Sequence, residues 1–155
     1  MKNKALFLDR DGTINVEKNY LYKIDDFEFI KETVDLCQKA QDKGYLLIVI
    51  TNQSGVARGY YTENDMNLCN SYMINKFKEF GINITDVFCC LSDDDKHPDR
   101  KPNSGMFLQA KEKYNIDMEK SISLGDKARD IVAAKNAGVQ KNFLISDVEK
   151  VGELL

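Results

Sequence analysis

The chain has 155 residues, of which 43% are hydrophobic and 30% charged, with four Cys, one His and no Trp. A chain of this length buries enough surface to fold without disulfides, so we expect a single domain over residues 1–155. The 22 Lys and Arg residues against 25 Asp and Glu give a net charge of −3 with no basic block, which argues against nucleic acid or an anionic membrane as the partner.

The longest apolar run, residues 45–50, is far too short to span a bilayer. The first five residues lead into a strand-like segment and lack the pattern of a signal peptide. We therefore expect a cytoplasmic protein, and we expect it to be a monomer.

Short apolar runs typical of strands alternate along the chain with longer segments of helical spacing. The strand-like runs, each followed by polar residues, are Ala5–Leu8, Leu46–Ile50, Val87–Leu91, Ile122–Leu124 and Phe143–Ile145. Apolar residues recur at helical spacing from Ile30 to Ala40, from Met66 to Phe77, from Phe107 to Tyr114 and from Ile131 to Ala137.

Capping residues mark the ends of these helical segments. Thr62 and Asp65 form a capping-box pattern before the second segment, and Asn103-Ser104 is expected to cap the third. Glycines at positions 44, 81 and 138 are expected to end three of the helices.

Apolar strands that alternate with helices predict an α/β fold. We expect a doubly wound, Rossmann-like sandwich whose five-stranded parallel sheet is covered by helices on both faces. Ligands of such sheets bind beyond the carboxyl ends of the strands, where the irregular segments 13–29, 53–61 and 92–101 should converge.

Two acids follow the first strand directly, in the sequence Asp9-Arg10-Asp11-Gly12-Thr13. One interpretation is a turn whose Asp side chains accept from backbone amides. An EF-hand loop is excluded because its glycine would have to stand at position 14, which is Ile, and no Gly-rich phosphate-binding sequence occurs. The alternative is a site for a hard cation with a nucleophile.

The other strand ends supply Thr51, Lys101 and Asp126, each of which taken alone would be an ordinary strand-end, surface or capping residue. Together with Asp9 and Asp11 they suit phosphoryl transfer from a monoester. Asp9 and Asp126 would hold Mg²⁺, and Asp9 would attack phosphorus to give an aspartyl phosphate. Asp11 would act as general acid and then as general base, while Thr51 and Lys101 would bind the phosphoryl oxygens.

The motifs resemble those of the haloacid dehalogenase (HAD) superfamily of aspartate-nucleophile phosphatases. The closer similarity is to the D-glycero-D-manno-heptose-1,7-bisphosphate 7-phosphatases and the histidinol-phosphate phosphatases. It is carried by Phe7–Asn15, Thr51–Gly59, Arg100–Pro102 and Gly125–Lys127. The resemblance implies Mg²⁺-dependent removal of the C7 phosphate of a heptose 1,7-bisphosphate in lipopolysaccharide or capsule precursor biosynthesis. Histidinol phosphate or another small sugar phosphate is the alternative substrate.

The resemblance also implies a role for individual residues. Asp9 is the nucleophile and Asp11 the general acid/base, and Mg²⁺ is bound by Asp9, Asp126 and backbone carbonyls of Asp11 and Lys127. The segments Glu17–Tyr20 and Thr51–Ser54 are implied to line the substrate pocket. The implied substrate-binding residues are Glu17, Tyr20, Asn52, Gln53, Ser54 and Arg100. The implied supporting residues are Gly12 beneath the site, Thr13, and Asp130, which orients Lys127 or the metal site.

Arg58 and Arg100 are both available to hold a second anionic or hydroxylated group of the substrate, and the alternative for Arg58 is a plain surface charge. The segments 13–29 and 82–101 are too short to hold a large cap, so we expect a capless, open site.

One stretch departs from the family. The family usually carries a zinc loop of three Cys and one His before the Arg-Lys-Pro motif, whereas this chain offers only Cys90, Ser92, His97 and Asp99 there. Such a set would be a weak tetrahedral site, so we expect no structural zinc.

Two alternative functions, each from another class of protein, predict no Mg²⁺-dependent release of phosphate. A signalling receiver domain also places Asp, Thr and Lys at strand ends of a doubly wound fold. It does not need a second acid two residues after the first. A catalytically inactive binding protein is the other alternative, although no essential motif residue is missing.

Overall fold

The central sheet places the end of the first strand in the middle of the molecule. The structure, a computed structural model, describes residues 1–155. Its five strands are β1 (Ala5–Leu8), β2 (Leu46–Asn52), β3 (Asp86–Cys90), β4 (Ile122–Gly125) and β5 (Lys141–Leu144). All are parallel, in the order β3-β2-β1-β4-β5. Leu8 pairs with Val49 on one side and Leu124 on the other, so three strands end around Asp9.

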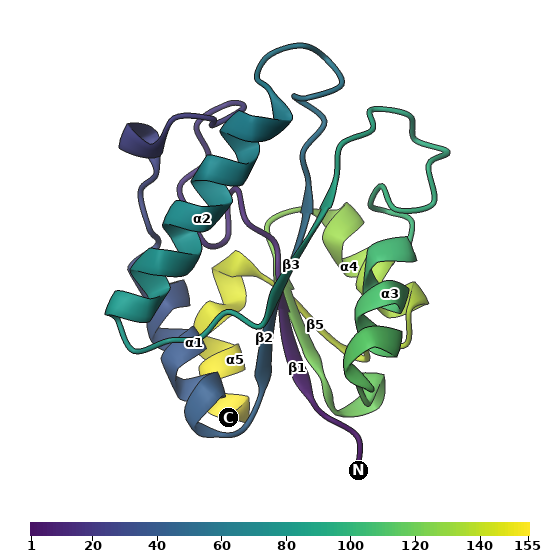
Figure 1. The fold of residues 1–155 in the computed structure, drawn as a ribbon. Coiled ribbons are helices and arrows are strands. Elements are labelled where there is room, and N and C mark those ends of the chain that lie inside the picture. The colour runs from purple at the N-terminus through teal and green to yellow at the C-terminus, as the bar shows by residue number, and fades with distance from the viewer.

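Helices cover both faces of this sheet. They are α1 (Lys31–Asp42), α2 (Glu63–Glu79), α3 (Gly105–Tyr114), α4 (Ala128–Asn136) and α5 (Val148–Leu154). Figure 1 shows α1, α2 and α5 on one face and α3 and α4 on the other. The predicted doubly wound, Rossmann-like α/β fold is confirmed.

Each face has its own apolar core, and β1 contributes to both. Leu6 and Leu8 belong to the core under α1, α2 and α5, which also holds Cys37 and Cys69. Ala5 and Phe7 belong to the core under α3 and α4. This alternation follows from the two-residue period of a strand. Because both faces of β1 are buried, its carboxyl end is held firmly from either side.

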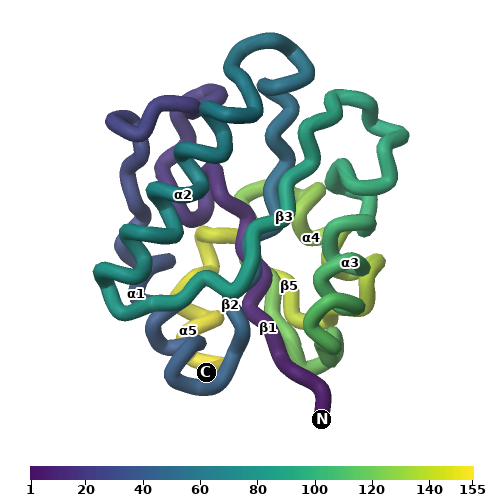
Figure 2. The backbone as a smooth tube through the Cα atoms, viewed as in Figure 1, coloured from purple at the N-terminus to yellow at the C-terminus, as the bar shows by residue number.

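The loops after β1, β2 and β3 gather at one end of the sheet, opposite the chain's N-terminus (Figure 2). The start of α2 and the ends of α1, α2 and α4 lie where the capping residues predict. Thr62 and Asp65 form a complete capping box on α2. The predicted terminal glycines at 44, 81 and 138 all have positive φ, between 80° and 104°.

Two expectations about helices differ from the structure. The Ser104 side chain does not cap α3, because its hydroxyl donates to the carbonyl oxygen of Ala133 at 2.8 Å. Asn103 donates instead to the carbonyl oxygens of Asp95 and His97, at 2.9 and 2.8 Å. The sequence reasoning also missed α5, whose seven residues pack against α1. No helix is both long enough and apolar enough to cross a membrane.

Replacing Phe77 with Ala is expected to lower the free energy of unfolding by about 3–5 kcal/mol, because it leaves a cavity in the larger core. Phe77 is fully buried on α2, and its ring meets that of Phe29 edge-on at 5.3 Å. Urea unfolding followed by far-UV circular dichroism measures the loss. Phe80 is the matched control, because its ring also meets Phe29 but is 47% exposed. An equal cost for Phe80→Ala would contradict this account of the core.

Candidate active site

A polar cavity of about 360 Å³ opens at the carboxyl edge of the sheet. The expected site residues that line it are Asp9, Asp11, Glu17, Tyr20, Asn52, Gln53, Ser54, Arg58, Arg100, Lys101, Asp126, Lys127 and Asp130. It is also lined by Asn19, which belongs to the expected segment Glu17–Tyr20, and by Tyr61 and Arg129, which the sequence reasoning did not select. Five acidic and five basic side chains therefore share one cavity, which suits a charged ligand.

Lys101 joins two carboxylates at the floor of this cavity. Its Nζ lies 2.9 Å from Asp9 Oδ1 and 2.8 Å from Asp130 Oδ1, and it donates to the carbonyl oxygen of Ile50 at 2.7 Å. The lysine side chain is only 2% exposed. Burial lowers the pKa of Lys101, but Asp9 and Asp130 outweigh it and raise the pKa above its ordinary value. The ammonium group therefore stays charged.

The backbone of Lys101 is held by Asn52. The Asn52 amide donates to the carbonyl oxygen of Lys101 at 3.1 Å and accepts from its amide N–H at 3.0 Å. This two-point contact fixes the loop that carries the lysine to the end of β2. Asn52, expected to bind substrate, therefore already has both polar atoms of its side chain engaged within the chain.

Three carboxylates form a cluster suited to a hard cation. Oxygen atoms of Asp9, Asp126 and Asp130 all lie within 4.8 Å of one another. Burial raises the pKa of Asp9 to about 8, with Lys101 opposing the shift and Asp130 adding to it. Burial likewise raises the pKa of Asp126. Oxygen-only donors that repel each other in this way fit a bound divalent cation such as Mg²⁺.

Asp130 differs from the other two acids because its oxygens are already engaged. Oδ1 accepts from Lys101, and Oδ2 accepts from the backbone N–H groups of Asp126 and Lys127, each at 3.1 Å. Asp130 thus fixes the first turn of α4, while Asp9 and Asp126 keep carboxylate oxygens free for a cation.

Glycine is required beneath these carboxylates. Gly12 has a φ of +86°, and a Cβ there would collide with the Asp126 carboxylate. A Cβ on Gly125 would lie 2.5 Å from the Cβ of Asp130. Neighbouring Thr13 is fully buried, and its carbonyl oxygen accepts from the Thr33 hydroxyl at 2.7 Å. Thr13 and Gly12 do not line the cavity, and the supporting roles expected for them stay predictions.

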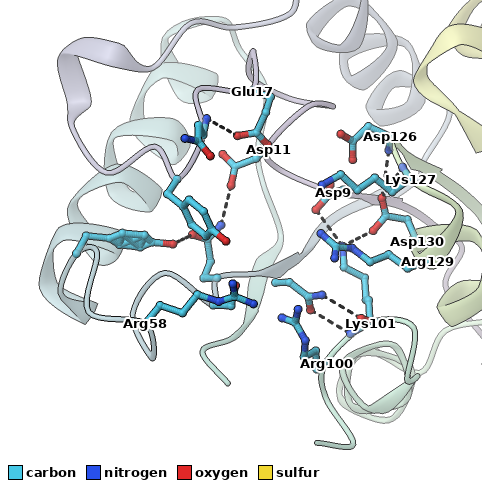
Figure 3. A pocket seen from close by; sticks show the side chains of 16 residues that line it. Asp9, Asp11, Glu17, Arg58, Arg100, Lys101, Asp126, Lys127, Arg129 and Asp130 are labelled. Atoms are coloured by element: carbon cyan, nitrogen blue, oxygen red, sulfur yellow. Dashed lines mark hydrogen bonds and ion pairs between the residues drawn. The ribbon is translucent and has the colours of Figure 1, made fainter. Parts of the chain in front are cut away.

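Asp11 faces a different part of the cavity from the other acids. Figure 3 shows Asp11 and Glu17 on one side and Asp9, Asp126 and Asp130 on the other. The Asp11 carboxylate accepts hydrogen bonds from Arg10, Asn15 and Gln53. The sequence gives no sign that the arginine between the two acids is itself buried.

Thr51 is not among the residues that line the cavity, and its expected contact with a phosphoryl group stays a prediction. Its hydroxyl is buried and accepts from Gln53 Nε2 at 2.9 Å. Tyr61, which the sequence reasoning missed, donates to Gln53 Oε1 at 2.5 Å. Burial raises the pKa of Tyr61 to about 12, so its hydroxyl keeps the proton that it donates. In this arrangement the Thr51 hydroxyl helps to orient Gln53.

The cations around the cavity fall into two groups. Arg100 is 7% exposed, and its guanidinium is held by Asp95 Oδ1 at 3.2 Å and by the carbonyl oxygen of Ser92 at 3.3 Å. Arg58, Lys127 and Arg129 make no ion pair within the chain. These three charges remain available to an anionic ligand.

The residues at the family's zinc-loop positions do not come together as a set of ligands. His97 Nδ1 lies 3.8 Å from Cys90 Sγ and accepts from the Asp99 backbone N–H at 3.1 Å. Asp99 Oδ1 accepts from Gln109, and Ser92 Oγ accepts from the backbone N–H of Asp94. These residues take part in hydrogen bonds that close the loop, and they do not form a cluster of three metal-ligating side chains.

Comparison with known proteins identifies close relatives. A family model described as polynucleotide kinase 3 phosphatase matches residues 4–150. The chain is 43% identical over 157 residues to D-glycero-alpha-D-manno-heptose-1,7-bisphosphate 7-phosphatase of Campylobacter jejuni, covering 99% of this chain and 88% of the relative. It is 43% identical over 145 residues to D-glycero-beta-D-manno-heptose-1,7-bisphosphate 7-phosphatase of Helicobacter pylori, covering 92% and 84%.

A solved structure gives the same result at the level of the fold. The D,D-heptose 1,7-bisphosphate phosphatase of B. bronchiseptica, complexed with magnesium and phosphate, superposes with a TM-score of 0.85. It is 26% identical in sequence, with 98% of this chain and 87% of that chain covered. The chain therefore belongs to the HAD superfamily of phosphatases, in the family that includes the heptose-1,7-bisphosphate 7-phosphatases.

Proposed function

We propose that the protein hydrolyses a phosphomonoester with Mg²⁺ through a phosphoryl group carried on Asp9. The observation that carries this proposal is the buried Lys101 bridging Asp9 and Asp130 beside Asp126. A phosphate dianion can approach the Asp9 carboxylate only where positive charge offsets the repulsion. Lys101 supplies part of that charge. Asp9, Asp126 and the backbone carbonyls of Asp11 and Lys127 would hold a Mg²⁺ ion, which would supply the rest of the positive charge.

The chain's own groups then divide the chemistry between them. An oxygen of Asp9 attacks phosphorus in line, and the bond from phosphorus to the leaving oxygen breaks as Asp11 gives that oxygen a proton. A water molecule then loses a proton to Asp11 and attacks the aspartyl phosphate, which releases inorganic phosphate and restores Asp9. Lys101 stabilises the phosphoryl oxygens in both steps because its charge is already in place.

We infer that the substrate is a D-glycero-D-manno-heptose 1,7-bisphosphate, cleaved at C7. The relatives that carry this name cover nearly the whole chain, and the cavity offers unpaired cations for a second phosphate. The alpha- and beta-named relatives are equally similar at 43% identity, so the preferred anomer is a question for assay. Histidinol phosphate is the alternative within the same mechanism.

Phosphate release in the presence of Mg²⁺ tests this function directly. The panel contains both heptose 1,7-bisphosphate anomers, histidinol phosphate, fructose 1,6-bisphosphate and p-nitrophenyl phosphate. The expected result is the highest kcat/KM on one heptose anomer, with all activity lost on chelation and restored by Mg²⁺. A preference for histidinol phosphate would keep the mechanism and change the substrate. No phosphate release from any compound would favour a receiver-like or binding role.

Binding of the phosphate group that is not cleaved should depend on the unpaired cations of the cavity. Arg129→Ala is expected to raise KM for the bisphosphate by about tenfold, because a charge-assisted hydrogen bond is lost, with little change in kcat. KM for p-nitrophenyl phosphate, which has no second phosphate, should stay the same. Lys135→Ala is the matched control, because this exposed lysine lies on α4 but outside the cavity. Equal KM changes on both substrates would place Arg129 at the cleaved phosphate.

We also propose that residues 1–155 act as one domain, as a monomer in the cytoplasm. Both cores of the single sheet draw residues from the two halves of the chain, which supports one folding unit. The four cysteines are free, as expected of a protein in a reducing compartment.

A further inference from the structure

A fully buried arginine lies directly behind the acid proposed to move protons. Arg10 has no exposed surface. Its Nε and Nη2 donate to Asp11 Oδ1 at 3.2 and 3.1 Å, and Nη2 also donates to Asp11 Oδ2 at 3.1 Å. Asp11 is its only carboxylate partner, so the pair is geometrically specific and does not belong to a general charge cluster.

Arg10 is itself fixed from two other parts of the chain. Nη1 donates to Asn70 Oδ1 on α2 at 2.9 Å, and Nη2 lies 3.4 Å from Gln53 Oε1 in the loop after β2. Gln53 is held in turn by Tyr61. A planar guanidinium with partners on three sides cannot rotate without breaking several hydrogen bonds. The orientation of Arg10 is therefore set by the fold.

The two oxygens of Asp11 are unequally occupied. Oδ1 accepts from two nitrogens of Arg10 and from Asn15 Nδ2 at 3.0 Å. Oδ2 accepts from Gln53 Nε2 at 3.0 Å and only shares the Arg10 Nη2 that also bonds to Oδ1. The Asp11 side chain is 19% exposed and lines the cavity. Oδ2 is thus the oxygen with capacity left for a proton exchanged with a substrate.

We propose that Arg10 is a positioning residue, which fixes the Asp11 carboxylate so that Oδ2 faces the leaving oxygen of the substrate. This inference rests on the proposed role of Asp11 as general acid. The proton passes from Oδ2 to the leaving oxygen as the bond to phosphorus breaks, and Arg10 holds the carboxylate that remains. Without Arg10, the acid would rotate and transfer its proton less efficiently.

The dependence of activity on the leaving group distinguishes a positioning role of Arg10 from a merely structural one. A basic leaving group needs protonation as it departs, whereas a weakly basic one leaves without it. Phenyl phosphate and p-nitrophenyl phosphate have similar shapes but differ in the basicity of the leaving phenolate. Because kcat/KM reports the steps up to formation of the phosphorylated enzyme, it isolates proton donation from the later use of Asp11 as a base.

The experiment measures kcat/KM for both aryl phosphates in the wild type, Asp11→Asn and Arg10→Lys, with Mg²⁺ present and folding checked by circular dichroism. Lysine keeps the charge but cannot form the two-point contact. Arg10→Lys is expected to lose about tenfold more activity on phenyl phosphate than on p-nitrophenyl phosphate, in the same direction as Asp11→Asn. Equal losses on both substrates, or no loss on either, would overturn the role of Arg10.

A second variant decides the question if Arg10→Lys fails to fold. Asn70→Asp keeps Arg10 paired but draws its guanidinium towards α2, so the same selective loss is expected, and its absence would overturn the inference. Asn67→Asp is the matched control, because Asn67 is exposed on the same helix and should leave the ratio of the two kcat/KM values unchanged. If Asp11→Asn itself shows no selectivity, the proposed function of Asp11 fails, which is a distinct result.

Discussion

Replacing Asp9 with Asn is expected to lower phosphate release by about 10⁵-fold or more, because the amide cannot act as the attacking nucleophile. The amide keeps the size of the carboxylate, so the shape of the cavity should be preserved. Activity is measured with Mg²⁺ on the best substrate of the panel, using protein purified free of contaminating phosphatases. Retention of wild-type turnover would show that the aspartyl-phosphate mechanism is wrong.

Folding of the Asp9→Asn variant can be checked through the pH dependence of its thermal stability. In the metal-free chain the pKa of Asp9 is raised from 3.8 to about 8 by burial. The native chain therefore binds more protons than the unfolded chain between these values, and wild-type stability should fall as the pH rises through this window. Asp9→Asn removes the contribution of Asp9 to this dependence. In chelator, its Tm at pH 8 should match or exceed that of the wild type.

The Asp11→Asn variant is the matched control for the loss of the nucleophile in Asp9→Asn. It keeps Asp9 but lacks the base that activates water, so phosphorylated enzyme should accumulate with p-nitrophenyl phosphate. Intact-mass spectrometry after rapid acid quench would show one added phosphoryl group. The double variant with Asp9→Asn should show none. A phosphoryl group that persists in the double variant would place the covalent step on another residue.

Lys101→Met is expected to have the second largest effect, lowering kcat by about 10³-fold through loss of the fixed charge at the phosphoryl oxygens. It should also destabilise the metal-free protein by about 3 kcal/mol, because Asp9 and Asp130 lose the buried cation that joins them. Enzyme assays and urea unfolding in chelator measure the two effects separately.

The control for the stability effect is Lys127→Met, which removes the same charge from the same cavity. Lys127 is exposed and makes no ion pair, so its loss should change the free energy of unfolding by less than about 0.5 kcal/mol. An equal destabilisation by both variants would mean that the Asp9–Lys101–Asp130 contacts contribute nothing specific.

Strand and helix periodicity was sufficient to predict the fold. Ala5–Leu8 matches β1 residue for residue, and the other strands differ by one or two residues at their ends. Such shifts arise because strand ends depend on pairing with a neighbour, as when Asn52 pairs with Cys90 to extend β2. Helix α5 was missed because its seven residues owe their helical state to packing on α1 more than to a periodic pattern of their own.

Site residues at strand ends were predictable, but their side-chain partners were not. Asp9, Lys101 and Asp126 meet because parallel strands deliver their carboxyl ends to one edge. From the sequence alone Arg10 would be expected on the surface, because arginine is seldom buried. In the structure it is buried, and one of its partners, Asn70, lies sixty positions away in the sequence. The Thr51 hydroxyl accepts from Gln53, a contact that no spacing rule predicts. Arg129 had a usable signal, because it stands three residues after Asp126 at the start of α4.

The central position of β1 has a consequence for the newly made chain. Strand β1 is synthesised more than a hundred residues before β4, yet Leu8 needs Leu124 of β4 as a partner, and Asp9 needs Asp126 and Asp130 just beyond it. The sheet therefore cannot close around the nucleophile until residues up to Asp130 have left the ribosome. A nascent chain that ends before β4 would carry Asp9 without its partners, and no phosphatase activity is expected of it.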